Sequence, residues 1–135
     1  MVLSVALSAA PRLQLEKLST ADAPDDVCAC IVRDAGKVVF FLDAESDHPV
    51  VRLDGKKLAL DKGKSTKPAD RPKVGDRFFE EYSAGDIAFR LDHTLTFVCP
   101  PDDESCEVAK FASTLTVKSG PATRVYKNLK SACGC

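Results

Sequence analysis

The chain has 135 residues, of which 44% are apolar and 29% are charged. This length and composition are ordinary for one soluble globular domain, and they exclude a chain that is disordered over most of its length. The net charge of −1 gives no reason to expect binding to nucleic acid or to an anionic membrane surface.

The N-terminal part of the chain is expected to precede the folded domain. Residues 1–10 form a short apolar run ending in Ser-Ala-Ala, as the site of signal-peptide cleavage does, although Pro11 directly after it is unfavourable. The run is too short to cross a membrane, because a spanning helix needs about 20 apolar residues. We therefore expect residues 1–26 to be an export-signal remnant or an N-terminal linker, and residues 27–135 to be one domain.

From residue 27 onward, short runs rich in Val, Ile, Phe, Thr and Leu alternate with turn residues, which predicts antiparallel strands. The predicted strands lie at 27–33, 38–42, 50–53, 57–60, 77–82, 87–99, 106–118 and 123–129. About eight strands joined by tight turns predict an all-β meander that closes into a barrel or folds into a sandwich, since closure removes exposed sheet edges. Alternation predicts that four large side chains point inward and fill the core: Phe40, Phe89, Phe97 and Phe111.

Six cysteines grouped in pairs indicate a secreted or periplasmic protein whose cysteines form disulfides. Cys28 and Cys30 lie two residues apart in a strand, roughly 6.6 Å, which is at the outer limit of what a disulfide spans. If their strand pairs antiparallel with the last one, Cys28 opposes Cys135 and Cys30 opposes Cys133, because both pairs of residue numbers have the same sum. We therefore expect these two bridges to join the first strand to the last.

Two alternatives to this pairing remain open at the level of the sequence. A parallel arrangement would join Cys28 to Cys133 and Cys30 to Cys135. The same four thiolates could instead bind zinc or copper, although structural zinc sites favour longer Cys-x2–4-Cys spacing. The remaining cysteines, Cys99 and Cys106, are expected to form a disulfide across the loop at residues 100–105.

Charge is distributed unevenly along the middle of the chain. Residues 56–77 carry eight basic and three acidic residues, and residues 78–106 carry seven acidic and one basic. These segments are either two ordinary solvated surfaces or a polar face that steers a charged protein partner. The second interpretation gives partner-binding residues in the polar segment 61–76, which is expected to be a long surface loop. These residues are Lys62, Lys64, Lys67, Arg71 and Lys73.

No set of residues at a catalytic spacing is recognisable. His48 and His93 are the only histidines, and neither has a Cys, Ser or acidic neighbour at a spacing that implies a catalytic set. We therefore expect both to be ordinary surface or hydrogen-bonded histidines, and we expect neither an enzyme nor a resident cofactor or metal.

The function that the sequence favours is that of a non-enzymatic, periplasmic or secreted protein that binds a protein partner in the cell envelope through charged loops. In architecture the expected domain resembles the small periplasmic β-barrels that inhibit lysozymes and the immunity proteins that neutralise secreted toxins. The Ser/Gly-containing inhibitory loop of the lysozyme inhibitors is not visible in the sequence. The alternatives are a carrier of a small apolar ligand inside the barrel and the cysteine-based metal site.

Overall fold

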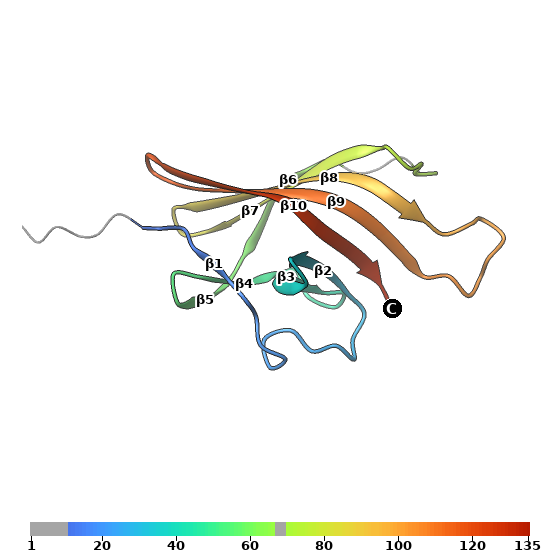
Figure 1. The fold of residues 1–135 in the computed structure, drawn as a ribbon, viewed down its shortest axis with the longest axis horizontal. Helices are drawn as coiled ribbons and strands as arrows, with labels where there is room; N and C mark the ends of the chain where they lie inside the picture. Colours follow the sequence, from blue (N-terminus) through green and yellow to red (C-terminus); the bar gives the residue numbers. More distant parts are fainter. Residues whose placement is uncertain (1–10, 67–69) are drawn as a thin grey trace, which may run out of the picture.

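The computed structural model describes residues 11–66 and 70–135, which form one antiparallel β-sheet (Figure 1). The strands are β1 (Leu15–Glu16), β2 (Ala29–Asp34), β3 (Lys37–Asp43), β4 (Val50–Leu53), β5 (Lys56–Ala59), β6 (Asp61–Ser65), β7 (Arg77–Ala84), β8 (Ile87–Val98), β9 (Val108–Ser119) and β10 (Ala122–Gly134). Their order in the sheet is β1-β4-β3-β2-β10-β9-β8-β7-β6, and β5 pairs with β4. Within the described ranges, no helix is long and apolar enough to span a membrane.

The sheet curves into an open half-barrel. In Figure 1, strands β6 to β10 form the upper layer and β1 to β5 lie below it, and the pairing of β10 with β2 joins the two layers. The predicted all-β antiparallel fold is confirmed. The predicted closed barrel or sandwich is not confirmed, because the sheet is open and ends at β1 and β6 among the described strands.

Strand β6 lies where the sequence predicts a surface loop. Residues 61–65 pair with β7, so the prediction of a loop over 61–76 is wrong for this first part. The five residues are polar or glycine and carry no β-forming signal of their own, so the neighbouring strand provides the pairing that defines them. Gly63 allows close contact here, since a Cβ atom on it would lie 3.2 Å from the carbonyl oxygen of Glu81.

The N-terminal segment packs onto the domain ahead of the predicted start at residue 27. Leu13, Leu15 and Leu18 are buried, with exposed fractions of 1%, 6% and 3%. The Tyr126 hydroxyl fixes this segment, because it donates a hydrogen bond to the Leu13 carbonyl oxygen at 2.6 Å and accepts one from the Leu15 amide at 2.9 Å. Leu13, Leu15 and Leu18 therefore belong to the buried core.

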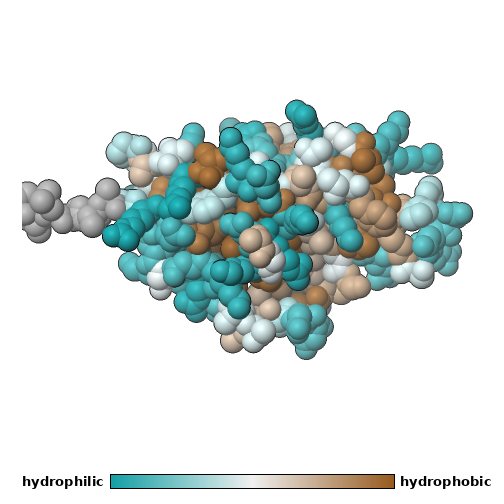
Figure 2. Space-filling view, viewed as in Figure 1, coloured by the Kyte–Doolittle hydropathy of each residue, from teal (hydrophilic) through white to brown (hydrophobic). Residues whose placement is uncertain are grey.

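Apolar side chains fill the concave side of the half-barrel, and Figure 2 shows hydrophobic residues between the two layers with hydrophilic ones around most of the periphery. Phe40 and Phe89 are buried there, as predicted. The inward prediction for Phe97 is wrong, because the register shifts between Leu95 and Phe97 and leaves the Phe97 side chain 40% exposed beneath the Lys110 ammonium group. A bulge of this kind reverses the face of every residue that follows it.

All six cysteines form disulfides. Cys28 is bonded to Cys135 and Cys30 to Cys133, as the antiparallel registration predicts, and Cys99 is bonded to Cys106. Cys30 and Cys133 are direct partners in the pairing of β2 with β10, with Cα atoms 4.0 Å apart. The parallel connectivity and the four-thiolate metal site are therefore wrong, because no free thiolate remains.

Candidate functional site

A chain of polar side chains crosses the concave side of the sheet. Its members come from four neighbouring strands: Glu80 on β7, His93 on β8, Ser113 on β9 and Ser131 on β10. His93 and Ser113 are direct partners in the ladder, whereas Glu80 and Ser131 lie one diagonal step away on either side. Diagonal neighbours on the same face of a sheet are within reach of each other's side chains.

Hydrogen bonds join these four side chains into one continuous chain. The Glu80 Oε1 atom lies 2.9 Å from His93 Nε2, and His93 Nδ1 lies 2.6 Å from Ser113 Oγ. The two serine hydroxyls are 2.6 Å apart. His93, Ser113 and Ser131 are buried, with exposed fractions of 5%, 4% and 6%. Each buried polar atom therefore has a partner, as burial of polar groups requires.

The carboxylate end of the chain determines where the protons lie. Burial raises the pKa of Glu80, but the hydrogen bonds from His93 and Tyr82 together lower it by more. The pKa is therefore below its ordinary value of 4.5. Burial and the adjacent Glu80 carboxylate together raise the pKa of Tyr82 far above its ordinary value. Because an ionised carboxylate can only accept hydrogen bonds, the Tyr82 hydroxyl and His93 Nε2 must both donate to Glu80.

It follows that Nδ1 of a neutral His93 accepts a hydrogen bond from the Ser113 hydroxyl, and Ser113 Oγ in turn accepts one from Ser131. When His93 is protonated, Nδ1 becomes a donor and both hydroxyl groups must turn round. Two aromatic rings hold the imidazole in place, with ring centroids 4.7 Å away for Phe78 and 5.3 Å away for Phe111.

A cavity of about 170 Å³ lies against the Ser131 end of this chain. Most of its wall is apolar, and the Cys30–Cys133 disulfide forms part of it. A second, more open cavity of about 270 Å³ adjoins it at the end of the half-barrel, because Cys30, Leu42 and Cys133 line both. The outer cavity is lined by the second disulfide and by Lys62 and Asp47, whose charged atoms lie 3.3 Å apart.

The sequence did not predict this site. His93 is a hydrogen-bonded histidine, as expected, but the fold gives it the acidic and serine partners that are missing from its neighbourhood in the sequence. The order carboxylate, imidazole, hydroxyl resembles that of a serine-hydrolase triad. Ser113 lines neither of these two cavities, but His93 and Ser113 both line a third, more open one of about 490 Å³. Both residues are nevertheless buried, with exposed fractions of 5% and 4%, so the hydroxyl next to the imidazole is not presented at the surface.

The predicted partner-binding residues lie along and after the edge strand. Lys62 and Lys64 are on β6, and Arg71 and Lys73 follow it; all four are exposed. Lys67 lies outside the described residues. The structure therefore places the first two on a strand instead of a loop, and it places Lys62 at the rim of the outer cavity.

The acidic segment 78–106 does not form a single surface. Glu80 is partly buried and bonded to His93. Glu81 and Asp92 are instead paired with Arg90, whose guanidinium group lies 4.0 Å from the centre of the Phe79 ring. The acidic residues at 102–104 lie in the loop closed by the third disulfide. The basic segment consequently has no matching acidic surface from this part of the sequence.

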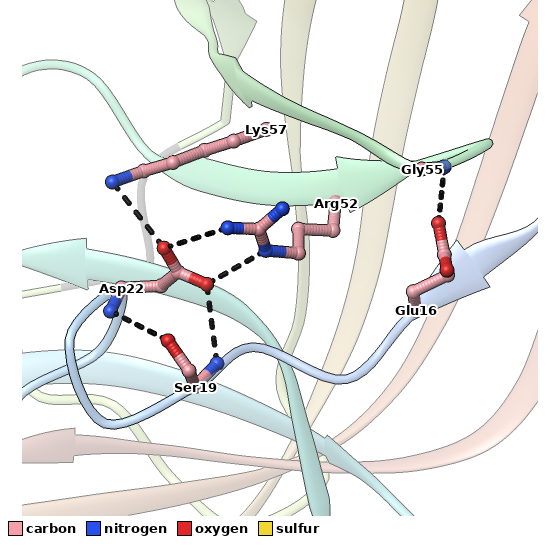
Figure 3. A network of polar contacts seen from close by, with 6 residues as sticks. All are labelled: Glu16, Ser19, Asp22, Arg52, Gly55 and Lys57. Carbon is pink, nitrogen blue, oxygen red and sulfur yellow. Dashed lines mark hydrogen bonds and ion pairs between the residues drawn. The ribbon is translucent and has the colours of Figure 1, made fainter.

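A second polar cluster, drawn in Figure 3, fixes the N-terminal segment to β4 and β5. The Asp22 carboxylate accepts hydrogen bonds from Arg52 Nε at 2.8 Å and Nη2 at 3.2 Å, and Lys57 Nζ lies 3.4 Å away. It also accepts one from the Ser19 amide. The Arg52 hydrogen bond, followed by the Ser19 amide, holds the pKa of Asp22 far below its ordinary value. This cluster is structural, since all its groups satisfy one another.

The fold and the site together define a class: a small, disulfide-stapled, open half-barrel with a polar chain beneath one end. No protein-family model matches the chain, no curated protein is similar to it in sequence, and no solved structure matches it in fold. Three disulfides are typical of proteins from an oxidising, extracytoplasmic environment. Any statement about its function therefore depends on the geometry of the chain itself.

Proposed function

We propose that this is a periplasmic or secreted binding protein that takes an acidic segment of a protein partner along strand β6. The observation that supports the proposal most directly is the position of β6 at the end of an open sheet, with all five of its residues exposed. Within the described part of the chain, β6 pairs with β7 only. An edge strand of this kind has unpaired main-chain groups that an extended segment of another protein can use.

The charges around β6 favour an acidic partner. Lys62 and Lys64 lie on the strand itself, Arg71 and Lys73 lie in the connection that follows it, and Arg77 begins β7; all five are exposed. Lysines on an edge strand oppose pairing between copies of the same chain, because like charges would meet. They attract a strand of opposite charge and increase its rate of association.

A carrier of a large apolar ligand is less well supported. The interior cavity of about 170 Å³ is below the roughly 300–1,000 Å³ of ordinary ligand pockets. Two of the large inward side chains, Phe40 and Phe89, fill the core beside it. A lipid-sized molecule would therefore need the half-barrel to open.

The proposal can be tested with charge reversals on the basic segment. The variant K64E/R71E/K73E reverses three exposed cations, and K118E/K127E/K130E reverses three exposed cations elsewhere with the same change in net charge. The immobilised protein would be exposed to an envelope or secreted fraction at ionic strengths of about 0.05 M and 0.5 M, since exposed charges are screened at the higher value. Bound proteins would be identified by mass spectrometry, and the affinity of each purified candidate then measured.

We expect the wild type and the control variant to bind the same acidic partner, and the first variant to bind it at least about tenfold more weakly. High salt should weaken the wild-type complex by a similar factor. Amide exchange of β6 should slow in the complex, because its edge becomes paired. The proposal fails if the two variants bind equally well, or if β6 amides exchange at the same rate with and without the partner.

A further inference from the structure

We propose that the interior cavity beside Ser131 is a binding site for a small, uncharged, largely apolar molecule that carries one hydrogen-bond donor, such as a phenol or a short-chain alcohol. No residue of strand β6 lines this interior cavity, and the assignment does not depend on the function proposed for that strand. Three properties support the assignment: the volume of the cavity, the composition of its wall, and the direction of the hydrogen bonds that end at Ser131.

The volume sets the size of the ligand. A protein cavity of about 150 Å³ lined by apolar side chains accommodates a benzene-sized molecule, and this cavity is about 170 Å³. The adjoining outer cavity of about 270 Å³ provides a route from the surface. Leu42 and the Cys30–Cys133 disulfide line both cavities and therefore lie at the boundary between them.

The wall sets the polarity of the ligand. Val32, Phe40 and Phe111 give it an apolar surface, so an ion would lose its hydration without compensation. An anion is disfavoured further by the ionised Glu80, which also lines the cavity. The Glu80 oxygens already accept hydrogen bonds from the Tyr82 hydroxyl and from His93, and the wall of the cavity offers a cation no second carboxylate.

The hydrogen-bond chain sets the kind of polar group. With a neutral imidazole, His93 Nδ1 accepts a hydrogen bond from the Ser113 hydroxyl. Ser113 Oγ in turn accepts one from the Ser131 hydroxyl. The Ser131 hydroxyl then has no hydrogen left for the cavity, but its oxygen retains lone pairs that no other described residue uses. A ligand that fits must therefore donate a hydrogen bond to Ser131.

The test compares phenol with toluene, which has nearly the same shape but no donor. Dissociation constants for both would be measured by ligand-observed NMR at about pH 8. The variants are Ser131→Ala, which removes the acceptor, and Leu42→Phe, which enlarges the side chain at the boundary between the two cavities. Ser65→Ala, on exposed β6, is the control. Amide chemical-shift dispersion would show that each variant is folded.

We expect phenol to bind with a millimolar or lower dissociation constant and to shift the amide resonances of Val32 and Ser131. The ratio of the toluene constant to the phenol constant should fall about three- to tenfold in Ser131→Ala, as expected for the loss of one hydrogen bond. Leu42→Phe should weaken both ligands, and Ser65→Ala neither.

The inference is wrong if the wild type binds no phenol up to about 10 mM, or if Ser131→Ala leaves the ratio unchanged. It is also wrong if the shifted resonances lie on the outer face of the sheet. None of these outcomes tests the function proposed for β6, because the residues changed in the charge-reversal variant do not line the interior cavity.

Discussion

Ser113 occupies the middle of the polar chain, where it bonds His93 on one side and Ser131 on the other. We expect Ser113→Ala to lower the free energy of unfolding by about 1–3 kcal/mol, because it leaves a buried imidazole nitrogen without its partner. Urea denaturation measures the change. The control is Thr114→Ala, because Thr114 is the next residue on β9 and its side chain points to the other face. Equal losses of unfolding free energy in the two variants would show that the hydrogen bonds of Ser113 add no stability.

Part of this series of hydrogen-bonded side chains could have been found from the sequence. Alternate residues of a strand point to the same face of the sheet. His93 therefore shares a face with Phe89 and Leu91 on β8, and Ser113 shares one with Leu115 and Val117 on β9. A polar residue at an inward position must find a buried partner, so the pattern alone predicts a hydrogen-bonded interior. The identity of the partners could not be predicted, because it depends on the register of β7 and β10 against these strands.

At the scale of elements, hairpins were predictable and isolated strands were not. Asp-Gly is a preferred dipeptide for a tight hairpin turn, and Asp54 and Gly55 have the positive φ angles of 50° and 81° that such a turn requires. The strands on either side lie close to their expected bounds. Strand β1 has two residues and β6 has five polar ones, so neither carries enough alternation to be recognised. Their pairing comes from tertiary contacts that a local pattern does not encode.

The docking of the N-terminal segment on β4 and β5 leads to a prediction about pH. The Asp22 carboxylate has a lower pKa in the folded protein than its ordinary value of 3.8, chiefly through the Arg52 hydrogen bond. Its contribution to stability is therefore present above 3.8 and is lost as the pH falls below that value. Asp22→Asn should be less stable than the wild type near pH 7, and the difference should shrink below pH 3.8.

Unfolding free energies of the two proteins at several pH values would measure this difference. Asp26→Asn is a matched control, because Asp26 is an exposed carboxylate in the same part of the chain. A difference between the wild type and Asp22→Asn that stays constant with pH would show that the carboxylate charge does not hold the segment in place.

The architecture of the whole molecule explains where its two long-range disulfides lie. Most pairings join consecutive strands, whereas β2 pairs with β10 across nearly the full length of the domain. Closing so long a loop costs entropy that local hairpins do not. Cys28–Cys135 and Cys30–Cys133 span 107 and 103 residues and bridge this one pairing. The cysteine positions therefore reinforce the contact that the chain is least able to form by local folding.

Because the two bridges close almost the same loop, removing one should cost far less than removing both. We expect Cys28→Ala/Cys135→Ala to retain most of the free energy of unfolding. Removal of all four cysteines should cost about 4.7 kcal/mol, the entropy of one loop of about 100 residues.

The four-cysteine variant should also refold more slowly, because β2 and β10 must then find each other by diffusion. Guanidinium denaturation and stopped-flow refolding measure both effects, with the Cys99→Ala/Cys106→Ala variant as a control for a bridge of separation 7. Additive losses from the two long-range bridges would show that each one restrains a different part of the unfolded chain.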